Sequence, residues 1–201
     1  EICKNINIQK IEIRTETDED VKEYVQKKDT SNILVDLPQE FLELQKVLKD
    51  LKNEKMLDLK KVGFTKPLYL VNKKDLIQLQ NRFRAEISKK GFMAFYGISL
   101  TSQILKLDHA LDLLETQGLN QLKEYFEKLK TETAKASKII VNNEKIKKVI
   151  EKIEELSKIV KHPKIIKLKE IILEELTKDQ NIKIIVFANF RNTVEDIIKS
   201  L

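Results

Sequence analysis

The sequence predicts a mainly α-helical protein, a helical bundle with short β segments at both ends. Three observations support this fold class. Apolar residues recur at spacings of three and four over most of the 201 residues, as they do along one face of a helix. Only four glycines and three prolines occur, too few for a turn-rich β-sandwich. Near each end, the apolar spacing changes to the alternation or short continuous run that is typical of strands.

The N-terminal part of the chain is predicted to be strand-like. Residues 6–8 and 11–17 alternate between apolar and polar side chains, and residues 33–37 form a second short strand that ends at Pro38. From Pro38 the period becomes helical, because proline suits the first turn of a helix. The first long helix is expected over residues 38–61.

Five further helices are predicted before the pattern changes again. Their expected ranges or starting residues are 72–91, 92–117, 119–136, a helix capped by Asn142 or Asn143, and a helix that begins at Pro163.

Residues 182–187 are an almost continuous apolar run, as in a buried parallel strand, and Asn189 is predicted to cap a last helix. These changes of period divide the chain into residues 1–37, 38–160 and 161–201. Because the strand-like ends have few partners, we expect a fragment whose middle part is a self-contained helical domain.

The charge is unevenly distributed. The net charge is +6, yet residues 135–169 alone carry 11 basic and four acidic side chains. This excess indicates either a solvated helix face or a surface that binds a polyanion. A single cysteine excludes an internal disulfide, no apolar run approaches the ~18 residues of a membrane span, and no secretory signal is visible. We expect a cytoplasmic protein without a membrane segment.

No complete active site is recognisable, and we predict no catalytic residue and no metal site. The P-loop, G-x-G-x-x-G, H-E-x-x-H and G-x-S-x-G motifs are absent. Two histidines, His109 and His162, lie about 50 residues apart and are the only ones. We expect His109 to be structural within a helix and His162 to mark a helix boundary before Pro163.

Three stretches, in order along the chain, resemble superfamily 2 helicases of the archaeal Hef and Fanconi anaemia M group. Residues 11–25 resemble the end of the first motor domain in that group. Residues 107–119 and 135–138 are similar to the Hef insert domain, which resembles a polymerase thumb. Residues 162–193 resemble the start of the second motor domain, including the strand of motif IV, which many helicases share.

The resemblance implies that this chain is the thumb-like insert of an ATP-dependent DNA helicase that acts on forked or branched DNA. The family's ATP-binding lysine, DEAH and arginine-finger motifs would then lie outside the chain. The parent protein would use ATP and Mg²⁺, and the fragment would need no cofactor and perform no hydrolysis. Duplex or branched DNA and the flanking motor domains in cis are the expected partners. The fragment is expected to be a monomer, from a nucleoid-associated archaeal protein.

Candidate nucleic-acid-binding residues fall into three groups, because lysine and arginine side chains gain affinity by releasing phosphate counterions. The alternatives are solubility, complementarity to the helix dipole for Lys89 and Lys90, and an N-cap role for Asn189. The groups are Lys73, Lys74, Arg82, Arg84, Lys89 and Lys90; then Lys135, Ser137 and Lys138; then Asn189, Arg191 and Thr193.

Two other functions remain open on sequence alone. A helical protein-interaction scaffold would use its lysines only for solubility, and an insert of the Dicer-like branch would bind double-stranded RNA. Four aromatic residues, Tyr69, Phe92, Phe95 and Tyr96, are candidates for stacking on single strands. Their helical spacing beside leucine and isoleucine favours a place in the core instead.

Overall fold

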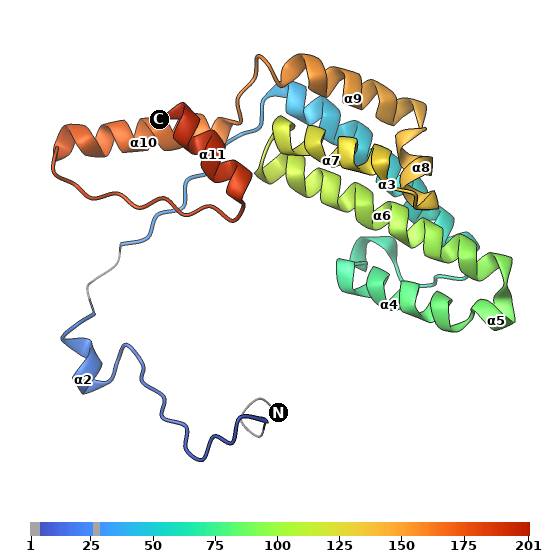
Figure 1. Cartoon of the computed structure of the whole chain (residues 1–201), viewed down its shortest axis with the longest axis horizontal. Coiled ribbons are helices and arrows are strands. Elements are labelled where there is room, and N and C mark those ends of the chain that lie inside the picture. The colour runs from blue at the N-terminus through green and yellow to red at the C-terminus, as the bar shows by residue number, and fades with distance from the viewer. Residues whose placement is uncertain (1–4, 26–28) are drawn as a thin grey trace. The chain divides into compact units, whose positions relative to one another are not determined.

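The computed structural model describes residues 5–25 and 29–201 and is mainly helical (Figure 1). The chain divides into two compact units, Glu1–Leu34 and Val35–Leu201. The first unit contains the short helix α2 (Glu19–Lys22). Just before α2, Arg14 forms ion pairs with Glu12 at 2.5 Å and Asp20 at 3.1 Å.

Four helices form the centre of the second unit: α3 (Gln39–Lys61), α6 (Phe92–Thr116), α7 (Leu119–Thr131) and α9 (Glu144–Leu156). Each places an apolar stripe at helical spacing toward the others, which removes these side chains from water. The shared core comprises Phe41, Leu44, Leu48, Leu51, Leu107, Ala110, Leu111, Leu113, Leu114, Leu119, Leu122, Phe126, Leu129, Ile140, Ile146, Val149, Ile150 and Ile153.

A second layer covers the N-terminal half of α6. It consists of η1 (Leu68–Leu70), α4 (Lys73–Ala85) and α5 (Ile87–Lys90). A smaller core joins this layer to α3 and α6. Its residues are Met56, Leu59, Leu76, Leu100 and Ile104.

Local sequence sets the ends of several helices. Asn72 begins α4 with a reciprocal capping box, since its side chain accepts from the Asp75 amide at 2.9 Å while Asp75 accepts from the Asn72 amide. Asn143 caps α9. Gly118 separates α6 from α7 at φ 99°, a conformation that favours glycine.

His162 occupies the helix boundary that the sequence predicts. It precedes α10 (Pro163–Lys178), and its Nδ1 accepts from the Lys164 amide at 3.2 Å. Burial lowers the pKa of His162, and its ring packs edge-on against Phe41 at 5.6 Å. The histidine therefore has a structural role at the start of α10.

The predicted strands over residues 6–8, 11–17, 33–37 and 182–187 are not formed: none of the described residues belongs to a strand. Between α10 and α11 (Arg191–Ser200), the chain runs as an irregular connection (Figure 1). A strand is held by hydrogen bonds to a neighbouring strand, and a period-two pattern does not supply that neighbour. Residues Ile184–Phe187 accordingly leave their side chains exposed.

Three predicted helix boundaries need correction. The helix expected over 72–91 is broken at Glu86 into α4 and α5. The helix expected over 119–136 ends at Thr131, and a separate helix, α8 (Lys135–Val141), follows. Phe190 rather than Asn189 precedes α11 as its N-cap, and it makes no side-chain capping bond. In the middle of the chain, periodicity located the helices correctly but did not fix where adjoining helices separate.

We expect Gly97→Ala to destabilise the packing of α4 on α6. Alanine ordinarily favours a helix over glycine by up to ~1 kcal/mol. A Cβ at position 97 would, however, lie 2.6 Å from the buried Phe83 ring. We therefore expect a net loss of about 1–3 kcal/mol in the free energy of unfolding, measured by urea denaturation followed by circular dichroism.

The double variant Phe83→Leu with Gly97→Ala serves as the control for this clash. If the contact is the cause, the double variant loses less stability than the sum of the two single variants. Strict additivity would contradict the explanation.

Candidate nucleic-acid interface

The corner between α7 and α8 carries two of the lysines that the sequence offers as candidates for phosphate binding. Lys135 and Lys138 lie three residues apart on α8, so they share one side of the helix. Both are exposed, and neither has an ion-pair partner among residues 5–25 and 29–201. The opposite side of α8 buries Ala136, Ser137 and Ile140. The two ammonium groups are therefore available to an external anion.

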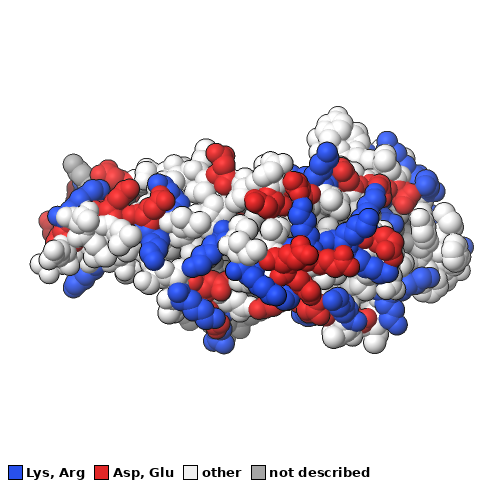
Figure 2. All heavy atoms as spheres, turned by 90° about the horizontal axis from the view of Figure 1, so that it is seen from above, with Lys and Arg blue, Asp and Glu red and all other residues white. Residues whose placement is uncertain are grey.

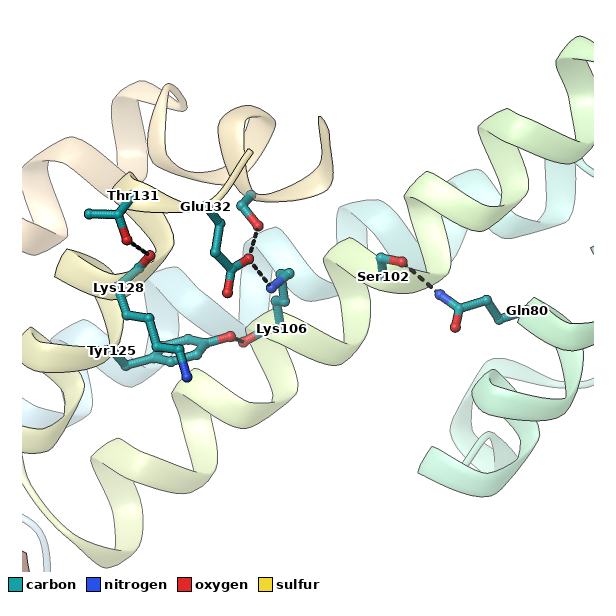
Figure 3. A network of polar contacts seen from close by, with 8 residues as sticks. Gln80, Ser102, Lys106, Tyr125, Lys128, Thr131 and Glu132 are labelled. Carbon is teal, nitrogen blue, oxygen red and sulfur yellow. Dashed lines mark hydrogen bonds and ion pairs between the residues drawn. The ribbon is translucent and has the colours of Figure 1, made fainter. Parts of the chain in front are cut away.

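Ser137 does not face outward with these lysines. It is fully buried, and its Oγ donates to Glu132 Oε2 at 2.5 Å. The same carboxylate oxygen accepts from Lys106 Nζ at 2.7 Å, which joins α6 to the start of α8 (Figure 3). The direct phosphate contact expected of Ser137 does not fit this position. Its hydroxyl instead helps to hold the helix that presents Lys135 and Lys138.

Glu132 and Tyr125 both form hydrogen bonds with Lys106 at the corner between α7 and α8. Hydrogen bonds from Lys106, and then from Ser137, hold the pKa of Glu132 below its ordinary value. Tyr125 donates its hydroxyl to the Lys106 carbonyl at 3.1 Å, and burial raises its pKa (Figure 3). The Tyr125 ring also meets the exposed His109 edge-on, with the ring centroids 4.8 Å apart. Lys106 thus joins α6 to both α7 and α8.

The first predicted group, Lys73 to Lys90, lies on α4 and α5. Lys73, Lys74 and Lys89 are exposed and form no ion pair within the described residues. Arg82 and Arg84 flank buried Phe83 and are both exposed.

Glu86 partly neutralises this group. Its carboxylate forms ion pairs with Arg82 at 3.1 Å and with Lys90 at 2.8 Å. The bonds from Lys90, and then from Arg82, lower the pKa of Glu86. Arg84 instead donates to the neutral amide of Gln80 at 3.3 Å. The cations without a carboxylate partner in this group are therefore Lys73, Lys74, Arg84 and Lys89.

The third predicted group surrounds the start of α11. Asn189 and Arg191 are exposed, whereas the Thr193 hydroxyl is buried and has no hydrogen-bond partner in the described part of the chain. Two contacts join α11 to α7: Asn192 donates to Glu124 at 2.7 Å, and Gln121 donates to Asp196 at 2.8 Å. The structure therefore places the first two groups on helices that pack on α6, and the third against α7.

Carboxylates distant in sequence neutralise much of the basic stretch on α9. Lys145 pairs with Glu54 of α3, and Lys152 pairs with Glu43 of α3. Figure 2 shows the resulting alternation of basic and acidic side chains over the middle of that view. The charge count of residues 135–169 did not reveal these partners, because they lie about 90 to 110 residues earlier. By contrast, no carboxylate among the described residues forms an ion pair with Lys135 or Lys138.

The four aromatic residues expected in the core are instead exposed. Tyr69, Phe92, Phe95 and Tyr96 all show more than a third of their surface to solvent. Helical spacing correctly placed the last three on one helix, but the covered face of α6 is the opposite one, which buries Ala94 and Gly97.

None of the helices in the described residues is long and apolar enough to span a membrane.

Comparisons with known proteins agree on one family. A family model described as "Putative ATP-dependent RNA helicase, helical bundle" matches residues 40–160. The whole chain is 36% identical to the "Putative ATP-dependent RNA helicase MJ1505" of Methanocaldococcus jannaschii and covers 25% of it. It is 26% identical to the ATP-dependent DNA helicase fml1 of Schizosaccharomyces pombe and covers 26% of that protein. The chain thus spans about a quarter of these relatives' length.

A solved structure matches the fold over the whole chain. The crystal structure of the Pyrococcus furiosus Hef helicase domain superposes with a TM-score of 0.76 at 35% sequence identity. The match covers 100% of this chain and 43% of that one.

We expect Glu132→Gln to remove a pH-dependent contribution to stability. A lowered carboxylate pKa stabilises the fold above the ordinary value of about 4.3, and this contribution is lost as pH falls through the folded-state pKa. The variant should lose about 1 kcal/mol of unfolding free energy at pH 7 and approach the wild type as the pH is lowered toward 3. Thermal unfolding at several pH values measures this difference.

Glu127→Gln is a matched control, because within the described residues Glu127 pairs only with Lys130 on the same helix, at 2.7 Å. It should follow the wild-type profile across the pH range. A pH-independent difference between Glu132→Gln and the wild type would contradict the assignment.

Proposed function

The chain belongs to the ATP-dependent RNA helicase helical-bundle family, and we propose that it grips duplex or forked DNA for such a helicase. The observation that carries the proposal is the pair Lys135 and Lys138. Both are exposed, neither has a carboxylate partner among the residues that the structure describes, and the buried, hydrogen-bonded Ser137 between them anchors their helix. Ammonium groups held in this way bind phosphates as point charges and release counterions. The grip depends on charge and shape rather than on reading bases.

Exposed cations of the other groups extend this proposed surface. The helices α4 and α5, which pack on α6, carry Lys73, Lys74, Arg84 and Lys89. The helix α8 packs on another part of α6. Arg191, at the first turn of α11, is the corresponding candidate beside α7. Arg82 and Lys90 contribute less, because Glu86 already pairs with both.

In this proposal, residues 1–201 do not carry out the ATP hydrolysis of the longer protein. ATP and Mg²⁺ need a phosphate-binding loop and a cluster of carboxylates, and the sequence has no P-loop motif. Among residues 5–25 and 29–201, no group of three or more potential ligands converges. The residues present therefore do not fit an ATP site. Motor domains in cis would supply hydrolysis, while this chain, as a monomeric module, would hold the nucleic acid.

Double-stranded RNA is a second candidate ligand, favoured by the printed name of the M. jannaschii relative. The S. pombe relative is named a DNA helicase. Titrations against a DNA fork, a plain DNA duplex, a single strand and an RNA duplex, each at several salt concentrations, separate these candidates. Preference for forked DNA with a steep salt dependence supports the proposal. Tighter binding of RNA favours the second ligand, and weak, salt-independent binding to all four favours a protein-interaction scaffold.

We expect Lys135→Ala with Lys138→Ala to weaken binding to a DNA fork and to lower the salt slope by about one to two units. Each lysine that neutralises one phosphate accounts for about 0.9 of that slope on duplex DNA. Fluorescence anisotropy with a labelled fork, repeated over a range of salt concentrations, gives both quantities.

Lys167→Ala with Lys178→Ala is the matched control. It changes the net charge equally, but both lysines pair with glutamates one turn away on α10, at 2.9 Å and 2.6 Å. This control should retain nearly the wild-type slope. An equal fall in both double variants would mean that net charge alone governs binding and would remove the α8 site from the proposal.

A further inference from the structure

Four apolar side chains at the start of α6 face solvent. The exposed fractions are 76% for Phe92, 45% for Met93, 58% for Phe95 and 37% for Tyr96, and we call this set the α6 aromatic face. Single exposed apolar residues are ordinary on protein surfaces, whereas a contiguous patch commonly marks a binding site. Three aromatic rings within five residues of one helix form such a patch.

The patch is not a by-product of helix packing. The side of α6 that packs inward in these turns uses Ala94, Gly97 and Leu100. Residues 91–105 contain no charged side chain, although 35% of the whole chain is charged. Packing therefore does not require aromatic residues on the outer side.

Two of the rings are arranged in parallel. Phe92 and Tyr96 lie one helical turn apart, with their ring planes 10° from parallel and their centroids 6.5 Å apart. Flat rings with exposed faces suit nucleobases, because every base has a π-face that stacks regardless of sequence.

The stretch of sequence that contains the patch is predominantly basic. Residues 73–107 hold seven basic and two acidic side chains, and the two acids, Asp75 and Glu86, are both engaged in ion pairs. Lys89 lies three residues before Phe92 and has no ion-pair partner in the described part of the chain. An unpaired lysine this close in sequence to the rings can contact the phosphate backbone of a strand that stacks on them.

From this combination we propose that the α6 aromatic face is a stacking platform for unpaired bases of a nucleic-acid strand, with Lys89 contacting the neighbouring phosphate. The inference rests on the proposed function, since the strand would be the single-stranded part of the fork whose duplex Lys135 and Lys138 grip. An apolar protein segment is the competing occupant. The parallel rings of Phe92 and Tyr96, with the exposed Lys89 nearby in sequence, favour the polyanion.

The test is the double variant Phe92→Leu with Tyr96→Leu, which keeps apolar bulk and removes the flat rings. We expect about tenfold weaker binding to a fork that carries a single-stranded arm, and unchanged binding to a blunt duplex. A 2-aminopurine base in the arm reports stacking directly, because its fluorescence is quenched by the wild type and should recover with the variant. Arms of deoxyribose and of ribose distinguish the two sources of unpaired bases.

Two control variants separate stacking from other effects. Tyr96→Phe keeps the ring and should behave as the wild type. Leu57→Ala removes an apolar side chain that is 55% exposed on α3 and should leave both substrates unaffected. Circular dichroism verifies that each variant is folded, as the exposure of the substituted side chains leads us to expect.

The outcomes distinguish this inference from the proposed function. If the wild type fails to bind the blunt duplex in a salt-dependent manner, the proposed function fails. If the duplex is bound and the leucine variant matches the wild type on armed forks, the stacking platform alone is overturned. The platform is also overturned if the variant changes only self-association, as measured by light scattering.

Discussion

Five helices pack on α6, and they can do so because α6 presents small or apolar side chains around much of its circumference. The absence of a side chain at Gly97 leaves room for the ring of Phe83 from α4. The buried hydroxyl of Thr101 donates a hydrogen bond to the Gly97 carbonyl at 2.9 Å. Farther along, Leu107, Ala110 and Leu114 enter the main core. Close packing of this kind tolerates little change in volume. The positions of α3, α4, α5, α7 and α8 consequently depend on α6.

Electrostatics decides which of the many lysines remain available once the helices are packed. The pairs of α9 with α3 involve partly exposed side chains, which contribute little to stability. They also cancel local charge that would otherwise attract an anion. Lys106 acts differently, since its pair with Glu132 is less exposed and shares the carboxylate with buried Ser137. The pairs of α9 with α3 thus neutralise exposed lysines, whereas the pair of Lys106 with Glu132 holds the helix that carries the proposed contact residues Lys135 and Lys138.

Much of this arrangement could be predicted from sequence, for identifiable reasons. A helix is a local structure, so the spacing of Leu44, Leu48 and Leu51 and the cap at Asn143 locate helices without knowledge of the fold. The strand expected over residues 182–187 depends on a distant partner and did not form. Periodicity also shows which residues share a face but not which face is covered. Phe92, Phe95 and Tyr96 were therefore expected in the core, and the burial of Ser137 was missed.

The candidate sites have different physical requirements, and α6 can meet both. Phosphate binding by lysine requires position more than precise orientation, because an ammonium group acts as a point charge. Base stacking requires fixed ring planes, which a long, well-packed helix supplies. Phe92 and Lys106 are separated by about 21 Å along α6 at ~1.5 Å per residue, which corresponds to about six nucleotide steps of ~3.4 Å. Since Lys106 holds the α8 corner and Phe92 begins the aromatic face, one rigid helix would set the spacing between the duplex grip and the first unpaired bases.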